Sequence, residues 1–271
     1  MGFLAFTVVV AGLVVGYLKR DDAYVLTISI AVSAYALAHV VSKLAELRGG
    51  FFWPILLSRT VFWRADVRVS VAYLISIPVE DTQLLVKGHR ITSQFQPVGG
   101  VFKTRINTAE LSRRFNARPD IRFTPDETSA RDMRLRLRGK ELLGLLKWFE
   151  SRQERELFPW REFHEELIAT GILRKADFPF FDCSFLGTRH FPFEFDKYSQ
   201  CRQLIIAEIY ELIPTARQAT ALSNLRRRQE KDPVGGIYFA TREEIERGAV
   251  AGGSQATFDI ARTARWLVDK T

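Results

Sequence analysis

Residues 161–167 read REFHEEL, and the spacing of the acidic residues in this stretch guides the interpretation of the whole chain. Glu165 and Glu166 follow Glu162 by three and four positions, so a helix would place all three carboxylates on one face. Carboxylates gathered in this way repel one another unless a positive group lies against them. Mg²⁺ or Mn²⁺ would provide that charge, and Arg161 could orient one carboxylate through two hydrogen bonds. We therefore predict a metal site here, with a solvated acidic face as the alternative.

Runs rich in β-branched and aromatic residues predict strands on both sides of this stretch. They cover residues 67–78, 82–89 and 95–103 before it, and residues 182–191 and 201–213 after it. Residues 235–248 predict a further strand that leads into a short acidic turn. Gly99 and Gly100 interrupt the third run, which indicates a bulge or a close approach of the backbone. Helical spacing over 140–170 and an amphipathic pattern over 256–269 predict helices. These elements predict an α+β fold arranged as an α/β/α sandwich.

Basic side chains suggest contacts with phosphate groups. Residues 104–138 carry many arginines, and a solvated surface is the alternative to an anion-binding one. Lys87 and Arg90 flank a short polar segment that could bind phosphate, although a hairpin turn explains it equally well. Arg226 and Arg227 lie in a late polar stretch that we interpret as a loop, and guanidinium groups are good partners for phosphodiester oxygens.

The composition is that of a globular protein. The 271 residues include 26% charged residues and carry a net charge of +8, and the mean hydropathy is −0.05. These values argue against global disorder and a collagen-like chain, and two cysteines are too few for a disulfide framework. Walker, dinucleotide-binding and zinc motifs are absent from the sequence.

The N-terminal part of the sequence differs from the rest. Residues 2–18 and 23–42 have no Asp, Glu, Lys or Arg, and the tetrad KRDD separates them. We predict a transmembrane hairpin over residues 1–48, with helices at about 2–18 and 23–42. A signal peptide and a pair of buried soluble helices are the alternatives. The bias of basic residues would place the N-terminus and the domain 49–271 in the cytoplasm, as in a multi-pass protein of a bacterial inner membrane.

Three stretches of the chain together resemble a Nudix domain. REFHEEL partly matches the REUXEEXGU core of the Nudix box, residues 96–103 look like the glycine-containing strand before it, and residues 238–248 look like the family's late acidic segment. The resemblance implies that Glu162, Glu165 and Glu166 are catalytic and bind Mg²⁺ or Mn²⁺, and that Arg161 orients them. It also implies cleavage of nucleoside diphosphates linked to another group.

The match to the Nudix box has three departures. Ile168 stands where the closing glycine is expected, and Gln153 occupies the register of the upstream glutamate. A long insertion, at about residues 104–150, separates the glycine strand from the box.

A two-helix hairpin joined to an expanded Nudix-like domain resembles a narrower group, the SMODS-associated Nudix proteins, or 2TM-Nudix effectors of CBASS antiphage systems. This implies that a cyclase makes a cyclic nucleotide on infection and that the cytoplasmic domain senses it. The oligomerised membrane part would then disrupt the bilayer. The implied partners are a cyclic nucleotide or oligonucleotide, lipid and further copies of the chain, with no DNA or RNA polymer. Gly99, Gly100, Lys87, Arg90, Arg226 and Arg227 are the candidate ligand-binding residues.

Two other functions stay open at this point. The chain could be a membrane-tethered, Mg²⁺-dependent Nudix pyrophosphohydrolase, in which the glutamates act as metal ligands and base. It could also be an interaction protein that uses its basic face on anionic lipid. The sequence leaves open whether the chain is an enzyme.

Overall fold

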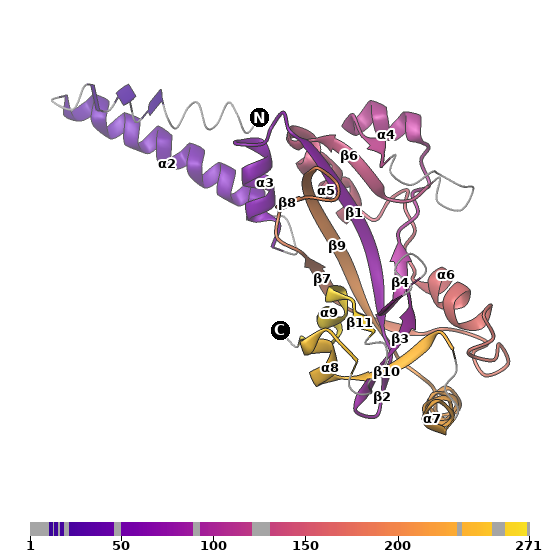
Figure 1. Cartoon of the computed structure of the whole chain (residues 1–271). Helices are drawn as coiled ribbons and strands as arrows, with labels where there is room; N and C mark the ends of the chain where they lie inside the picture. Colours follow the sequence, from indigo (N-terminus) through magenta and orange to yellow (C-terminus); the bar gives the residue numbers. More distant parts are fainter. Residues whose placement is uncertain are drawn as a thin grey trace. The chain divides into compact units, whose positions relative to one another are not determined.

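A computed structural model of the chain describes residues 11–12, 14–15, 17–18, 22–45, 50–88, 93–120, 131–231, 235–250 and 258–269 (Figure 1). The chain forms two compact units, each built from three sequence segments. Unit 1 comprises Met1–Val69, Ile106–Glu154 and Phe191–Leu204. Unit 2 comprises Ser70–Arg105, Arg155–His190 and Ile205–Thr271.

Unit 2 is built around antiparallel strands in the order β10-β3-β4-β1. These are β10 (Ile237–Thr241), β3 (Thr82–Lys87), β4 (Gln94–Val101) and the part of β1 (Asp66–Ser76) that lies in this unit. The short strand β2 (Pro78–Val79) pairs with β3, β11 (Asp259–Ile260) pairs with β4, and β7 (Cys183–His190) pairs with β9 (Cys201–Leu212). The strands predicted at 67–78, 82–89 and 95–103 are therefore confirmed, as are those at 182–191 and 201–213.

Hydrophobic side chains on both faces of these strands are buried, so each face has its own core. Ile75 and Leu84 pack in a cluster with Phe163 and with residues of α7 (Ala216–Lys231). Their neighbours Leu74 and Leu85 pack in a second cluster with residues of α8 (Arg242–Arg247) and α9 (Arg265–Val268). Because successive side chains of a strand point to opposite faces, helices cover both faces. The predicted α+β class is confirmed.

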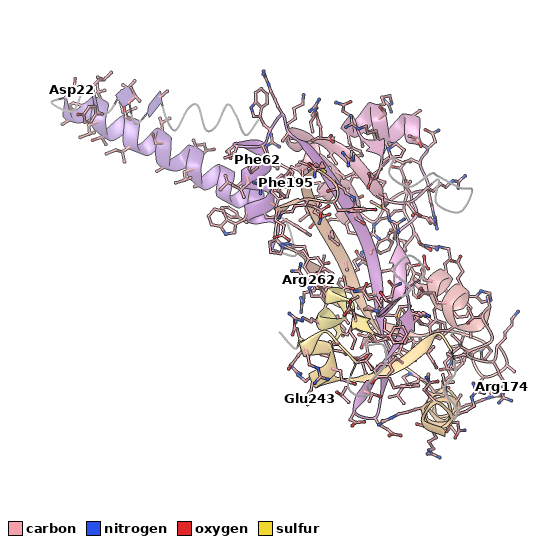
Figure 2. The ribbon with its side chains drawn as sticks, viewed as in Figure 1. Asp22, Phe62, Arg174, Phe195, Glu243 and Arg262 are labelled. Carbon is pink, nitrogen blue, oxygen red and sulfur yellow. The ribbon has the colours of Figure 1, made fainter. Side chains whose placement is uncertain are left out.

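The figures show the same division of helices within unit 2. In Figure 1, α8 and α9 lie on one side of the strands, and α6 (Trp160–Phe163) and α7 lie on the other. Exposed Glu243 of α8 and exposed Arg174, which follows the turn after α6, mark these two sides in Figure 2. The REFHEEL stretch lies on the side of α6 and α7 (Figure 1).

Unit 1 contains most of the predicted insertion at 104–150. Its elements are α2 (Ala23–Ala45), α3 (Phe52–Arg59), α4 (Thr108–Phe115), β5 (Arg118–Pro119), β6 (Arg134–Arg138), a 3₁₀ turn (Gly139–Glu141), α5 (Leu142–Glu150) and β8 (Glu194–Asp196). A Cβ on Gly139 would lie 2.2 Å from the carbonyl oxygen of Phe62. Glycine at this position therefore lets the 3₁₀ turn approach the backbone that follows α3.

Several arginines of this unit are held by carboxylates. Arg68 Nε and Arg136 Nε donate to the two carboxylate oxygens of Asp120, at 2.6 and 3.1 Å. Arg136 and Arg118 also pair with Asp66, at 3.1 and 3.0 Å. We call these five residues the Asp120 network. Part of the arginine-rich stretch thus has intramolecular anions as partners.

The predicted transmembrane hairpin is wrong. Among the described residues, no helix is both long enough and apolar enough to cross a membrane. In α2, polar side chains at Thr27, Ser29 and Ser33 interrupt the apolar residues. Residues 1–10, where much of the first span was predicted, lie outside the described residues. The predicted multi-pass inner-membrane location fails for the same reason.

Two further elements differ from expectation. Arg226 and Arg227 lie within α7, a helix of 16 residues, rather than in a loop. For the predicted helix 256–269, the described part contains β11, a 3₁₀ turn and the four-residue helix α9. The helices predicted over 140–170, in contrast, are present as α5 and α6, which residues 151–159 separate.

Candidate functional site

The REFHEEL stretch meets the sheet at the two glycines of β4. The amide of Gly99 donates a hydrogen bond to Glu166 Oε2 at 2.9 Å. A Cβ on Gly100 would lie 2.0 Å from Glu162 Oε1, and one on Gly99 would lie 2.2 Å from the carbonyl oxygen of Tyr73. Gly99 also has φ +147°, a conformation that side-chain-bearing residues rarely adopt. Gly100 therefore leaves room for the Glu162 carboxyl, and Gly99 lets β4 approach the backbone of β1 at Tyr73.

The helix that carries the carboxylates changes type along its length. After α6, residues His164–Ile168 form a π-helix, and the amide of Ala169 donates to the carbonyl of His164 at 2.8 Å. Gly171, with φ +76°, ends the segment, and the amide of Leu173 donates to the carbonyl of Leu167. One π-turn adds one residue to the helix and therefore accounts for only part of the late position of this glycine. Such π-turns are frequent at functional sites.

Buried aromatic residues fix the orientation of this helix. Phe163 and Leu167 are fully buried, and the ring of Phe163 lies 5.6 Å from that of Phe178 and 4.9 Å from that of Phe181. With Phe163 and Leu167 in the core, the neighbouring acidic side chains differ in their exposure to solvent. The side chain of Glu162 is 16% exposed and that of Glu165 is 55% exposed. Glu166 is buried.

Arg161 lies at the centre of the acidic residues. Its Nη1 donates to Glu162 Oε1 at 2.6 Å and to Glu165 Oε2 at 3.3 Å. Its Nε and Nη2 donate to the two oxygens of Glu156, at 3.1 and 3.2 Å, and Nη2 also donates to the carbonyl of Val101. A single guanidinium therefore contacts three carboxylates and strand β4. We call Glu156, Arg161, Glu162, Glu165 and Glu166 the glutamate site.

Glu156 is a member that sequence reasoning missed. The motif register pointed to Gln153, three residues earlier. Glu156 instead reaches the site because its backbone amide donates to the carbonyl of Lys103 at 2.8 Å, next to β4. The amide of Lys103 in turn donates to Glu156 Oε2 at 3.2 Å. The available signal was an acidic residue five positions before Arg161, which is not distinctive by itself.

Burial controls the protonation of the glutamates. It raises the pKa of Glu166 to about 8, an effect that the amide of Gly99 opposes and the charges of Glu162 and Glu165 reinforce. Burial also raises the pKa of Glu162, against the opposing effect of Arg161. Although burial lowers the pKa of Arg161, its hydrogen bond to Glu156 keeps that pKa above the usual value. Arg161 thus stays charged while two of the carboxyls are biased towards their neutral forms.

Tyr73 is a second residue that sequence reasoning missed. It lies on β1 directly opposite Gly100, is fully buried, and packs its ring edge-on against Phe102 at 4.8 Å. Its hydroxyl has no hydrogen-bond partner within the part of the chain that the structure describes. Burial, then the charge of Glu156, raises its pKa. An unpaired buried hydroxyl therefore lies beside the glutamate site.

The predicted basic ligand-binding residues lie in other contacts. The Lys87 ammonium sits 5.5 Å from the ring centroid of Phe258. Arg226 Nη1 pairs with Glu80 at 2.7 Å and with Asp81 at 2.8 Å, and Arg227 is exposed on α7. Arg90 lies outside the described residues. The structure therefore brings together the predicted acidic residues, Arg161 and both glycines, but it does not show Lys87 or Arg226 in contact with them.

The glutamate site has the donor chemistry of a divalent-cation site. Within the ranges that the structure describes, no group of three or more His, Cys, Asp or Glu residues is already arranged around a metal position. The carboxylate oxygens themselves suit a hard cation. Because Arg161 already contacts Glu162 and Glu165, a cation would have to share these ligands with it.

Comparison with known protein families gives a match. The model of the SMODS-associated NUDIX domain matches residues 66–268, which include β1, both glycines of β4 and the whole glutamate site. Comparison with curated proteins gives no match.

Proposed function

The chain belongs to the SMODS-associated NUDIX domain family, and from this premise we propose that its glutamate site binds a divalent cation together with the phosphate groups of a nucleotide. In this proposal the protein is a nucleotide-responsive effector of bacterial antiviral defence. Its ligand is a cyclic nucleotide that a cyclase makes on infection. Nudix domains generally use divalent metals, and Glu162, Glu165 and Glu166 are the ligands that we assign to Mg²⁺ or Mn²⁺ here.

The observation that carries the proposal is the buried carboxyl of Glu166. It accepts a hydrogen bond from Gly99, while Arg161 is engaged by the other three glutamates. A buried carboxylate without a cation of its own is unfavourable, so its pKa rises. A divalent cation binds deprotonated ligands and would reverse that shift. The glutamate site therefore lacks positive charge, which a cation would supply.

The same charge balance explains why a phosphate-bearing ligand needs the cation. The site holds four glutamates and one arginine, so phosphate oxygens alone would be repelled. A bound divalent cation offers positive charge to phosphate oxygens, as in many nucleotide sites. Exposed Glu165 marks the side from which a ligand can approach.

Calorimetry with Mn²⁺ tests the proposal, followed by titration of cyclic dinucleotides and trinucleotides with and without the cation. We expect nucleotide binding that requires the cation, and a cation affinity that falls about tenfold or more in Glu166→Gln. Glu246→Gln is the matched control, because Glu246 is exposed on α8 and pairs only at the surface with Arg242. Unchanged cation affinity in Glu166→Gln, or no nucleotide bound by the wild-type chain with Mn²⁺, would overturn the proposal.

Oligomerisation on ligand binding belongs to the same proposal, because an effector must convert binding into a second state. Light scattering after size-exclusion chromatography measures it directly. We expect the mass per particle to increase when cyclic nucleotide and Mn²⁺ are present together. A constant mass at saturating ligand would remove oligomerisation from the proposal.

Hydrolysis is the second candidate function, and the exposed carboxylate of Glu165 favours it. This group is the most accessible of the acidic side chains on the helix. Its contact with Arg161, at 3.3 Å, is longer than that of Glu162, at 2.6 Å. Phosphate release from nucleoside diphosphate derivatives with Mg²⁺ or Mn²⁺ tests it, and Glu165→Gln should abolish the release. Absence of release by the wild-type chain would leave binding alone as the function.

A further inference from the structure

A buried ion pair lies behind the glutamate site in unit 2. Arg155 Nη2 donates to Glu208 Oε1 at 2.8 Å, and both side chains are almost fully buried, at 0% and 4% exposure. The hydroxyl of Tyr210 donates to the other oxygen, Glu208 Oε2, at 2.7 Å. The Arg155 guanidinium also lies 4.6 Å from the ring centroid of Phe102. The arginine is thus held on two sides, by a carboxylate and by an aromatic face.

Arg155 connects this pair to the site through the next residue. Its Nη1 donates to the backbone carbonyl of Glu156 at 3.0 Å. Its backbone also forms an antiparallel bridge with Thr104, just beyond β4. The carboxylate of Glu156 then accepts both Nε and Nη2 of Arg161. An unbroken series of contacts therefore runs from Glu208 on β9 to the guanidinium at the centre of the glutamate site.

A buried ion pair is a weak source of stability, because removing two charges from water offsets much of their attraction. Packing alone would be served as well by apolar side chains of similar volume. The planar guanidinium, however, donates in two directions at once, to Glu208 and to the carbonyl of Glu156, which a lysine ammonium cannot match in geometry. Orientation, rather than stability, is the property that this arrangement provides.

We propose that Arg155 and Glu208 are positioning residues of the glutamate site: they fix the backbone of Glu156, and Glu156 in turn fixes the orientation of Arg161 between the carboxylates. This inference deepens the proposed function and rests on it, because the orientation of Arg161 matters for function only if the glutamate site binds a cation. The orientation of Arg161 itself can be measured without any ligand.

The test uses the full chain and the variant Arg155→Lys. Hydrogen exchange of the Arg161 Nε–H is followed by ¹⁵N nuclear magnetic resonance, with the signal assigned from its loss in Arg161→Lys. We expect exchange about tenfold faster in Arg155→Lys, and a Mn²⁺ dissociation constant raised about tenfold. Arg68→Lys is the matched control, since Arg68 is also a mostly buried partner of a carboxylate, in unit 1. It should leave both values within about twofold of the wild type.

Equal exchange of Arg161 Nε–H in wild type and a folded Arg155→Lys would overturn the inference. If Arg155→Lys does not fold, Tyr210→Phe decides, because it removes only one hydrogen bond to Glu208. That variant should speed the exchange about threefold, and unchanged exchange would again overturn the inference. A wild-type chain that binds no Mn²⁺ would contradict the proposed function, while the exchange measurement would still decide the positioning role.

Discussion

Unit 1 and unit 2 each contain a cluster of arginine and carboxylate side chains, and the two clusters have opposite charge balance. In the Asp120 network, three arginines surround two aspartates, and Asp120 receives hydrogen bonds from Arg68 and Arg136. In the glutamate site, one arginine faces four glutamates, and Glu166 receives a backbone amide instead. Both clusters contain a buried carboxyl group.

The protonation of the two buried carboxyls follows this balance. Burial acts to raise the pKa of Asp120, but Arg68 and Arg136 outweigh it and hold that pKa below its usual value. Burial of Glu166 outweighs the opposing effects of the Gly99 amide and Arg161, and its pKa rises to about 8. Burial by itself therefore does not decide the direction of the pKa shift. The arginines of the Asp120 network already balance its carboxylates, whereas the glutamate site has too few positive groups and is suited to receive a cation.

The largest effect is expected from Arg161→Gln. Loss of this guanidinium leaves Glu156 and Glu162 without their ion pairs, and because these pairs are partly buried we expect a cost of about 3 kcal/mol of unfolding free energy, the low end for a buried pair. Arg136→Gln in the Asp120 network should cost only about half as much, because Arg68 still pairs with Asp120. Urea unfolding of both variants at neutral pH measures the difference. Equal losses would mean that charge balance does not distinguish the clusters.

The pH dependence of stability should differ in sign between the two clusters. The folded-state pKa of Glu166, about 8, exceeds the ordinary glutamate value of 4.5, so the folded chain holds an extra proton between these values. Its contribution is complete below the unfolded pKa and is lost as the pH rises through 8, at about 1.4 kcal/mol per pH unit. Asp120 has a lowered pKa, so its contribution to stability is complete above pH 3.8 and is lost as the pH falls below that value.

Urea unfolding in a chelator, from below pH 3.8 to above pH 8, checks both signs. Glu166→Gln should remove the loss of stability that develops as the pH rises from 4.5 to 8, and Asp120→Asn should reduce the loss below pH 3.8. A slope between pH 4.5 and 8 that persists in Glu166→Gln would assign it to another group. Because cation binding needs the ionised carboxylate, Mn²⁺ affinity of the wild type should also increase up to about pH 8.

Gly100→Ala should have a smaller effect on stability but a clear one on the site. The new Cβ would meet Glu162 Oε1 at 2.0 Å and Cδ at 2.2 Å, so this side chain must move. We expect about tenfold weaker Mn²⁺ binding and a loss of about 1 kcal/mol on urea unfolding. Gly171→Ala is the control, since it strains a φ of +76° with no atom within 4 Å. Weaker Mn²⁺ binding in both variants would point to a general effect on the helix.

The smallest effect is expected from Tyr73→Phe. Its hydroxyl is buried with no partner in the described part of the chain, so its removal should change the unfolding free energy by less than about 1 kcal/mol. Urea unfolding measures this. A loss of more than about 2 kcal/mol would show that the hydroxyl makes a hydrogen bond in solution.

Local pattern explains which parts of the fold could be predicted from the sequence. Alternating and β-branched runs identified the strands that carry Gly99 and Gly100, and helical spacing grouped Glu162, Glu165 and Glu166. Glu156 and Tyr73 were missed because each reaches the site through a contact between distant segments. Tyr73 lies across a strand pair from Gly100, and the carbonyl of Lys103 holds the backbone of Glu156. Spacing along the chain does not encode such contacts.

Two other errors arose from composition. α7 was interpreted as a loop because polar and basic residues dominate its sequence, although Leu222 and Leu225 anchor it in the core. The N-terminal runs were interpreted as membrane spans because they lack charged residues, but no helix among the described residues is both long enough and apolar enough to cross a membrane.

The absence of a side chain at Gly100 offers a way to sort relatives of this protein. Since even a methyl group there would occupy the place of the Glu162 carboxyl, a side chain at residue 100 requires the end of the side chain at residue 162 to move. A relative with a larger residue at the first position must have shortened or displaced the acid at the second. Inspection of these two columns in an alignment would therefore separate family members that keep the acidic centre from those that have given it up during evolution.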